Sequence, residues 1–300
     1  MKEEKFFVDF ADAKIAVFCY SQNYSTGEKE TQKVRNPLVL IHGFRGTHHG
    51  LLDIVREIFL LDKKDKSCRE IFIPDLPNFG ISQPLSLKND ASNFAKLTEE
   101  IINRVSQQTG VKTIDLFGHS FGTLVVSRTA KNSPEKIAKL ILVAPISRTA
   151  LSHLSAKFAN LYFVLAKFLP KKQREKWLRA KFAIKIMNNF AVKNPAKKKE
   201  ILTKHLAHFS DFQSVEAMLE TYFSACHDDI LSFANEILVP TLIISGNRDN
   251  IAPNKEAIEL SQTIPNGKFV EIANVGHILH HETPMEVSKA VVEYTTDCTD

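Results

Sequence analysis

The feature that most constrains this chain is an alternation of short apolar runs with helix-like segments, interrupted by one long stretch that has no strand pattern. Six β-prone runs precede the long stretch and two follow it. They span residues 6–10, 14–20, 37–41, 69–75, 113–119, 139–144, 240–245 and 268–272. The unbroken apolar run at 37–41 is typical of a strand buried on both faces. We therefore predict an α/β fold with a mostly parallel central sheet flanked by helices.

The long stretch, residues 146–236, also differs in charge from the sequence on both sides of it. Residues 146–204 contain fifteen Lys or Arg against two Asp or Glu, whereas residues 205–236 contain no Lys or Arg and six Asp or Glu. This contrast marks an insertion. We predict an all-helical cap, inserted after the sixth strand. The predicted division is 1–145 for the first part of the core, 146–236 for the cap or lid, and 237–300 for the second part of the core.

Composition excludes several classes of protein. The 300 residues are 44% hydrophobic and 24% charged, as in a soluble globular chain with a large core. The four cysteines form no C-x-x-C pair, so neither a metal knuckle nor a disulfide framework is indicated. The longest apolar run, residues 158–169, is too short for a membrane span, and the N-terminus MKEEKFFVDF is too acidic for a signal peptide. We expect a reduced, cytoplasmic protein, and its oligomeric state stays open.

The sequence Gly118-His119-Ser120-Phe121-Gly122 fits a G-x-S-x-G nucleophile elbow. It lies between a predicted strand and a predicted helix, which is the context that such an elbow requires. A serine on so sharp a turn has strained backbone angles, and side chains two residues away would collide with neighbouring elements. The helix that follows points its N-terminus at the reacting centre, where it favours negative charge. We predict that Ser120 is a nucleophile; the alternative is a structural serine in a turn.

A second glycine-containing loop, HGFRG, covers residues 42–46 and follows a predicted buried strand. Acyl transfer needs two backbone N–H groups aimed at the oxyanion, one of them from the residue after the nucleophile. We predict that Phe121 and Phe44 supply these groups. The alternative is a glycine-rich turn that binds nothing. We expect His42 to be a hydrogen-bonded structural histidine.

A carboxylate and an imidazole each follow the end of a late strand. Asp249 comes after the run ending at residue 245, and His277 comes after the run ending at residue 272. Open α/β sheets form their sites at these strand ends. The chain order Ser120, Asp249, His277 is the one expected for an elbow of this kind. As alternatives, Asp249 caps the next helix, or His280 or His281 replaces His277, although both fall inside the next helical turn.

These motifs together resemble the α/β-hydrolase superfamily, in a serine-hydrolase branch with a helical cap. Residues 74–82, PDLPNFGIS, resemble the family's D-x-P-G-x-G-x-S loop, with Asn78 where glycine is usual. Residues 276–284 match its G-H-x4-E-x-P ending, and the insert at 146–236 lies where the family carries its lid. A serine rather than an aspartate at the elbow argues against the dehalogenase and epoxide-hydrolase branches.

The function implied is hydrolysis of a small-molecule carboxylic ester or thioester. Ser120, deprotonated by His277, attacks an acyl carbon, and Asp249 holds the imidazolium while Phe44 and Phe121 bind the oxyanion. A water then releases the acyl group. The same three residues also fit carbon–carbon bond hydrolysis or acyl transfer, because the pocket decides the chemistry. A further alternative is a receptor of hydrolase fold that binds a ligand with negligible turnover.

We predict no cofactor, because the sequence has no G-x-G-x-x-G, no phosphate loop and no H-E-x-x-H. His205 and His208 are one helical turn apart, but no third metal ligand is visible, so no metal is predicted.

Two interpretations of the basic half of the cap stay open. In one, its lysines form a solvated face and its apolar side chains line a tunnel for an acyl or aromatic group. Those side chains are Phe158, Leu161, Phe163, Leu165 and Phe168. In the other, the basic face docks an anionic lipid surface or an acidic acyl carrier. Nucleic acid is not expected, because no aromatic-basic stacking motif accompanies the lysines.

Two residues are candidates for substrate binding. Phe163 belongs to the tunnel interpretation. Arg45, beside the oxyanion loop, pairs either with a substrate carboxylate or in a structural salt bridge.

Overall fold

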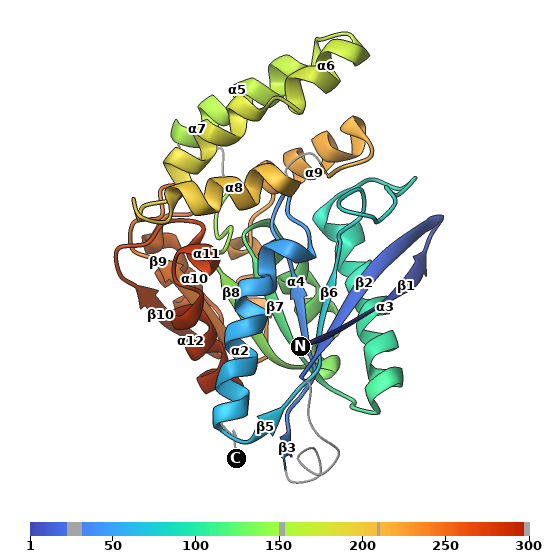
Figure 1. Ribbon diagram of the computed structural model, residues 1–300, viewed down its shortest axis with the longest axis vertical. Coiled ribbons are helices and arrows are strands. Elements are labelled where there is room, and N and C mark those ends of the chain that lie inside the picture. Colours follow the sequence, from blue (N-terminus) through green and yellow to red (C-terminus); the bar gives the residue numbers. More distant parts are fainter. Residues whose placement is uncertain (23–31, 150–153, 209–210, 297–300) are drawn as a thin grey trace.

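The centre of the molecule is an eight-stranded sheet in the order β1-β2-β6-β4-β7-β8-β9-β10 (Figure 1). The computed structural model describes residues 1–22, 32–149, 154–208 and 211–296. The strands are β1 (Lys2–Phe10), β2 (Ala13–Ser21), β4 (Leu38–Ile41), β6 (Ile71–Pro74), β7 (Ile114–His119), β8 (Ile137–Val143), β9 (Thr241–Gly246) and β10 (Gly267–Ile272). The pairs β1–β2 and β2–β6 are antiparallel and the other pairs are parallel. The predicted mostly parallel sheet is confirmed.

Helices cover both faces of this sheet, and each face has its own hydrophobic core. One core lies under α3 (Ala91–Thr109), α4 (Phe121–Asn132) and α10 (Asn254–Thr263). The other lies under α2 (Leu52–Lys64) and α12 (Pro284–Thr296). Strand β4 shows the division, because Val39 and Ile41 belong to the first core while Leu38 and Leu40 belong to the second. A strand buried on both faces has no polar alternation, which explains its continuous apolar run.

Helix α3 shows how local sequence sets the ends of an element. Its N-cap is Asp90, whose carboxylate accepts a hydrogen bond from the Asn93 N–H. It ends at Gly110, which has a φ of 72° in the left-handed region. The helix therefore extends beyond residues 94–105, where its apolar spacing is clearest.

In the described part of the interval between β8 and β9 there are five α-helices. They are α5 (Leu154–Lys167), α6 (Lys171–Leu178), α7 (Lys181–Ala191), α8 (Lys198–His208) and α9 (Val215–His227). In Figure 1, α5, α6 and α7 lie at the top, with α8 and α9 between them and the sheet. The division of the chain at residues 145 and 236 stays a prediction. Among the described helices, none combines the length and apolarity required to cross a bilayer.

Short elements complete the fold. They are the 3-10 helices η1 (His48–Leu51), η2 (Pro134–Lys136) and η4 (Leu231–Glu236), the helix α11 (Leu279–Glu282), and a small parallel sheet of β3 (Lys33–Val34) with β5 (Ser67–Cys68).

Candidate active site

The turn between β7 and α4 holds Ser120 in a backbone conformation that few residues other than glycine adopt. Ser120 has a φ of 51° and a ψ of −119°. A Cβ atom on Gly118 would lie 2.6 Å from the carbonyl oxygen of Gly122, and one on Gly122 would lie 2.3 Å from the carbonyl oxygen of Ile41. The two glycines therefore allow the chain to turn sharply into α4 while β4 packs against the turn.

Ser120, His277 and Asp249, which are far apart in the sequence, form one hydrogen-bonded series. The Ser120 hydroxyl and His277 Nε2 are 2.8 Å apart, and His277 Nδ1 and Asp249 Oδ2 are also 2.8 Å apart. When Nδ1 donates its proton to Asp249, Nε2 is left to accept the hydroxyl proton. His277 and Asp249 are buried and Ser120 is half-buried. The structure thus brings the three predicted residues together, and their roles in a reaction stay predictions.

Asp249 is fixed by the loop that follows β9. Its Oδ1 accepts hydrogen bonds from the N–H groups of Ile251 (2.8 Å) and Ala252 (2.9 Å), so Oδ2 is aimed at His277. The N-cap of α10 is Pro253. The structure therefore places the Asp249 carboxylate in the loop before the helix and not at its cap.

His119, the second residue of the elbow, supports the backbone of His277. Its Nε2 donates to the His277 carbonyl oxygen at 3.1 Å. Its ring centroid lies 3.9 Å from that of His280. Burial lowers the pKa of both His119 and His280, so both are neutral at neutral pH. This positioning contact was not predicted from the sequence, although His119 stands inside the elbow motif.

Glu282, at the end of α11, is a second support that the sequence analysis did not assign. Its Oε1 accepts from the Gly276 N–H (2.9 Å), directly before His277. Its Oε2 accepts from the N–H groups of Lys193 (2.8 Å) and Asn194 (2.6 Å), which follow α7. The carboxylate therefore ties the loop of His277 to the helical insert. Glu282 is the acidic residue of the G-H-x4-E-x-P ending, which was the available signal.

The predicted oxyanion loop packs directly on the elbow. A Cβ atom on Gly43 would lie 3.2 Å from the Cβ of Ser120, and Phe44 is the next residue. Phe121 is the first residue of α4, so no carbonyl within the helix accepts its N–H. His42 donates through Nδ1 to the Gly43 carbonyl oxygen (2.8 Å) and is held within the loop.

Arg45 joins this loop to the helical insert. The buried Arg45 Nη2 donates to the carbonyl oxygen of Leu178 on α6 at 3.0 Å, and its guanidinium lies 5.0 Å from the centroid of the Phe212 ring. Burial lowers the pKa of Arg45 to about 9. These contacts give Arg45 a structural role, made with a carbonyl oxygen and an aromatic ring where a salt bridge was the structural alternative predicted. Its predicted role toward a substrate stays a prediction.

Phe163, the other substrate-binding candidate, is buried beside the same loop. Its ring is stacked on that of Tyr222 with centroids 3.6 Å apart, and lies 6.0 Å from that of Phe44. The rest of the predicted tunnel lining is wrong where the structure describes it, because three of its side chains point to solvent. They are Leu161, Leu165 and Phe168, which are 52%, 47% and 80% exposed. The side chain of Phe158 lies outside the described residues.

Asn78, the departure from the family's glycine, has a φ of 77°. This left-handed conformation explains why glycine is usual there, and asparagine is one of the residues that tolerate it. Its Oδ1 accepts from the Ser214 N–H at 2.6 Å, so the side chain also links the core loop to the N-cap of α9.

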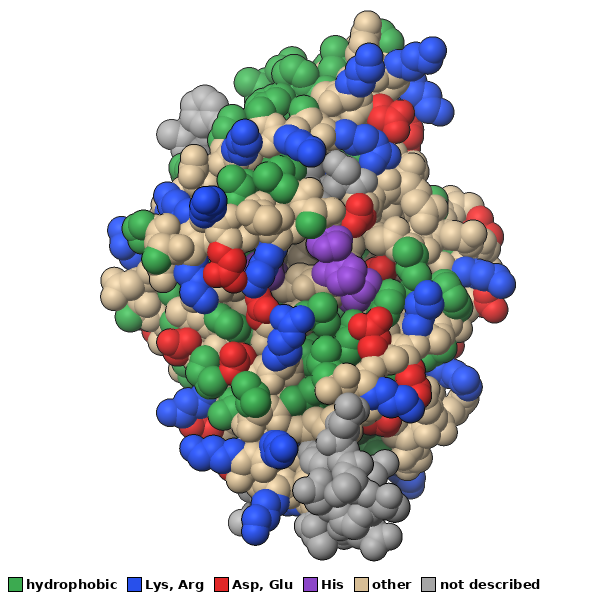
Figure 2. All heavy atoms as spheres, viewed as in Figure 1, with side chains coloured by type: hydrophobic (Ala, Val, Ile, Leu, Met, Phe, Trp, Pro, Cys, Tyr) green, Lys and Arg blue, Asp and Glu red, His purple; other side chains and the backbone are tan. Residues whose placement is uncertain are grey.

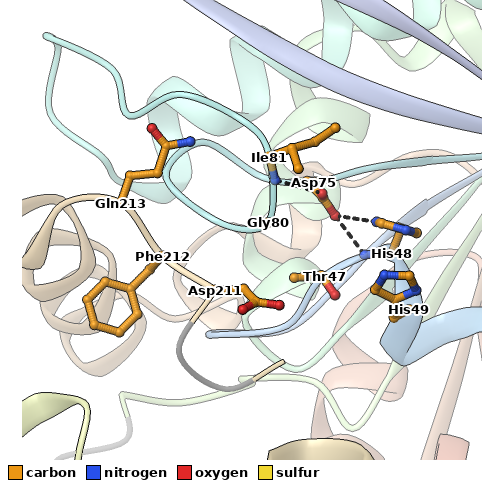
Figure 3. A pocket seen from close by; sticks show the side chains of 9 residues that line it. All are labelled: Thr47, His48, His49, Asp75, Gly80, Ile81, Asp211, Phe212 and Gln213. Carbon is orange, nitrogen blue, oxygen red and sulfur yellow. Dashed lines mark hydrogen bonds and ion pairs between the residues drawn. The ribbon is translucent and has the colours of Figure 1, made fainter. Parts of the chain in front are cut away.

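A cavity of about 300 Å³ lies beside this loop, away from the three predicted catalytic residues. Figure 3 shows its lining, which consists of Thr47, His48, His49, Asp75, Gly80, Ile81, Asp211, Phe212 and Gln213. Asp75 Oδ1 accepts from both the N–H and the Nδ1 of His48, each at 2.8 Å. Burial alone would raise the pKa of Asp75, but the hydrogen bonds from His48 lower it. This pair holds the start of η1 against the loop after β6.

The described residues contain no group of three or more His, Cys, Asp or Glu side chains placed to hold a metal ion. His205 lies against His281, with ring centroids 5.5 Å apart, and His208 stacks on His49 at 4.2 Å.

Comparison with known proteins agrees with this geometry. The family model described as alpha/beta hydrolase fold matches residues 36–284. The uncharacterized hydrolase YugF of Bacillus subtilis is 25% identical over 263 residues, covering 87% of this chain and 90% of that protein. The putative esterase/lipase 2 of Mycoplasma genitalium is 27% identical over 266 residues, covering 88% and 90%. The structure of a thermophilic esterase from Thermogutta terrifontis superposes with a TM-score of 0.71 at 20% identity, covering 98% of both chains.

The similar structure supports the fold, and the relatives named as hydrolase or esterase support the coarser prediction of an enzyme of this class. The extent of the family match shows that the chain belongs to the alpha/beta hydrolase fold family.

Proposed function

We propose that this chain is a serine hydrolase that cleaves a carboxylic ester or thioester through an acyl-enzyme on Ser120. The observation that carries the proposal is the series Ser120 Oγ–His277 Nε2–Asp249 Oδ2, with both hydrogen bonds at 2.8 Å. A serine hydroxyl is a weak nucleophile unless a base removes its proton. The series supplies that base and the carboxylate that holds the base in the required tautomer.

In the proposed reaction, Ser120 Oγ bonds to the acyl carbon as its proton moves to His277 Nε2. The negative charge on the former carbonyl oxygen is held by the N–H groups of Phe121 and Phe44. The imidazolium then gives its proton to the leaving alcohol or thiol, and the acyl group remains on Ser120. A water, deprotonated by His277, attacks the same carbon and releases the acid and the free serine.

The substrate class is proposed from the surroundings of the loop. The aromatic rings of Phe44, Phe163 and Tyr222 lie within 6.0 Å of one another, centroid to centroid, on the side of the loop that faces the cap. An apolar acyl group matches such a lining. The esterase names of the Mycoplasma genitalium relative and of the Thermogutta terrifontis structure support an ester. In this proposal residues 146–236 act as the cap that limits the size of that group.

Covalent labelling tests the proposal. We expect a small fluorophosphonate to add one adduct to the intact chain, detected by mass spectrometry, and none to Ser120→Ala. Ser245→Ala is the control, because Ser245 also lies at the C-terminal end of a parallel strand but is fully buried. It should label as the unaltered chain does. An unlabelled native chain, or an adduct retained by Ser120→Ala, would contradict the proposal.

A further inference from the structure

The outer face of the cap carries apolar side chains that the proposed reaction does not use. On α7, Phe182, Ile186 and Phe190 are 49%, 64% and 46% exposed. They are spaced four residues apart, so they lie along one face of the helix. On and just after α5, Leu161, Leu165 and Phe168 form a similar exposed row. We call these six residues the cap stripe.

Helix α7 meets α5 and α6 at the ring of Phe182. The ring of Phe182 lies 6.2 Å from that of Tyr162 on α5 and 6.1 Å from that of Trp177 on α6, measured between centroids. Both helices also bury an inner face, with Phe163 on α5 and Ile184 on α7. A helix that is apolar on two opposite faces is normally covered on both. The cap stripe is therefore apolar surface beyond what packing of the cap requires.

Positive charge surrounds the cap stripe. Residues 160–190 contain eight Lys or Arg and one acidic residue, Glu175. The exposed lysines are Lys167, Lys171, Lys172, Lys176, Lys181 and Lys185. Figure 2 shows apolar and basic side chains gathered together at the end of the molecule formed by α5, α6 and α7. The Glu175 carboxylate lies 3.2 Å from Arg179 Nε, which leaves the region strongly basic.

We propose that the cap stripe and its lysines dock the protein on the surface of an anionic lipid bilayer. Apolar side chains on an amphipathic surface helix enter the boundary between headgroups and acyl chains, and lysines beside them attract anionic headgroups. An anionic bilayer therefore accounts for both the exposed apolar side chains and the lysines around them. In a dimer formed through this surface, the lysines around one cap stripe would face those of the other and repel them. An acidic carrier protein would pair with the lysines but would leave the apolar side chains of the cap stripe uncovered.

The position of the surface fits the proposed function without depending on it. Helix α5 carries Leu161 and Leu165 outward and Phe163 inward, where its ring lies 6.0 Å from that of Phe44. A docked bilayer would therefore lie one helix thickness from the proposed acyl site.

Vesicle flotation of the full chain tests docking without any turnover. We expect binding to phosphatidylglycerol-containing vesicles, much weaker binding to pure phosphatidylcholine vesicles, and release by high salt. The double variant Ile186→Ser with Phe190→Ser should weaken binding about tenfold. Lys181→Gln and Lys185→Gln should each weaken it about fivefold. The control is Leu60→Ser with Leu238→Ser, since these residues are 60% and 61% exposed outside the cap.

Three outcomes would overturn the proposal: no binding to anionic vesicles, equal losses in the control variant, or a dimer in solution that the Ile186→Ser, Phe190→Ser variant abolishes. Because flotation requires no catalysis, a failure of labelling at Ser120 would leave this proposal standing, and a failure of flotation would leave the proposed hydrolase standing.

Discussion

The loops at the ends of the core strands and the helices of the cap differ in how strongly their surroundings determine them. In the core loops, neighbouring backbone segments lie so close together that a glycine position such as Gly246 has no room for a side chain. A Cβ atom there would lie 2.5 Å from the Val275 carbonyl oxygen. In the cap, α7 leaves Ile186 64% exposed and buries Ile184 on the opposite face. Tight packing allows the core loops only one backbone arrangement. A helix with apolar side chains on two opposite faces can instead pack against different neighbours. In the proposed function, the core carries the chemistry and the cap selects the group that reaches it.

Many polar contacts join the two regions, among them Lys204 with Asp53 and Gln213 with Ser82, and three more involve loops near the candidate site. Arg45 bonds to the Leu178 carbonyl, Asn78 to the Ser214 N–H, and Glu282 to the backbone after α7. All three residues lie next to or within loops of the candidate site. We call Arg45, Asn78 and Glu282 the joint between core and cap. If the comparison is correct, substitutions in the core should have the largest effects on activity or stability, those in the joint intermediate effects, and those in the cap the smallest.

The largest effect is expected from Asp249→Asn in the core. An amide in place of the carboxylate favours the other tautomer of His277, whose Nε2 then carries a proton and cannot accept one from Ser120. We expect kcat on a soluble ester to fall about 10³- to 10⁴-fold. Asp229→Asn is the control, because Asp229 also accepts a backbone N–H, from Ser232 in η4, and is not among the residues of the site. A loss below about tenfold for Asp249→Asn would show that the carboxylate does not orient the base.

The next effect concerns stability. Gly122→Ala would place a methyl group 2.3 Å from the Ile41 carbonyl oxygen, and backbone atoms cannot move aside without disturbing the sheet. We expect the free energy of unfolding in urea to fall by about 3 kcal/mol. Gly50→Ala, where no atom outside its own helix and chain neighbours lies within 4 Å of the new methyl group, should change it by less than about 1 kcal/mol. Equal changes in the two variants would mean that the elbow is less tightly packed than the structure shows.

Sequence patterns predict the core better than the cap, for a physical reason. Strands such as β4 and β7 are buried on both faces, so their apolar runs are unambiguous, whereas β3 and β5 have two residues each and no detectable period. The elbow and the strand-end loops have fixed spacing, so Ser120, Asp249 and His277 could be proposed from motifs. The contact between His119 and the His277 carbonyl spans 158 residues and depends on tertiary packing.

For the cap, helical spacing does not say which of two apolar faces turns inward. This is why the predicted tunnel lining was wrong for Leu161, Leu165 and Phe168 while Phe163 is buried. The charge of the insert was readable from sequence, but its association with an exposed apolar face required the structure.

Glu282→Gln tests the joint between the two regions. Both carboxylate oxygens accept backbone N–H groups, one from Gly276 and the other from Lys193 and Asn194. A glutamine would present an NH₂ group to one of these donors, so we expect a loss of about 1–3 kcal/mol in unfolding free energy. Glu220→Gln is the matched control: a single oxygen of Glu220 accepts both bonds from Asn89, which a glutamine oxygen can retain. If Glu282→Gln and the native chain are equally stable, the Glu282 carboxylate does not stabilise the contact between core and cap.

The smallest effect is a pH dependence that originates in the cap. Burial, together with a smaller contribution from the neighbouring His281, lowers the pKa of His205 on α8 to about 4. Because the unfolded side chain has a pKa of about 6.5, the unfolded chain takes up this proton first. Stability is therefore lost as pH falls from 6.5 toward 4, and levels off below 4.

Since His205 is only partly buried, we expect its share of this loss to be about 1–2 kcal/mol. Urea unfolding at pH 7 and pH 4.5 should show a smaller acid loss for His205→Gln than for the native chain. His227→Gln, which alters an exposed histidine at the end of α9, should leave the acid loss unchanged. The buried core histidines His119 and His280 are present in all three proteins, and burial, the main cause of their lowered pKa, is the same in each. If His205→Gln and the native chain lose the same stability, His205 does not contribute to the acid sensitivity, which then originates in other groups.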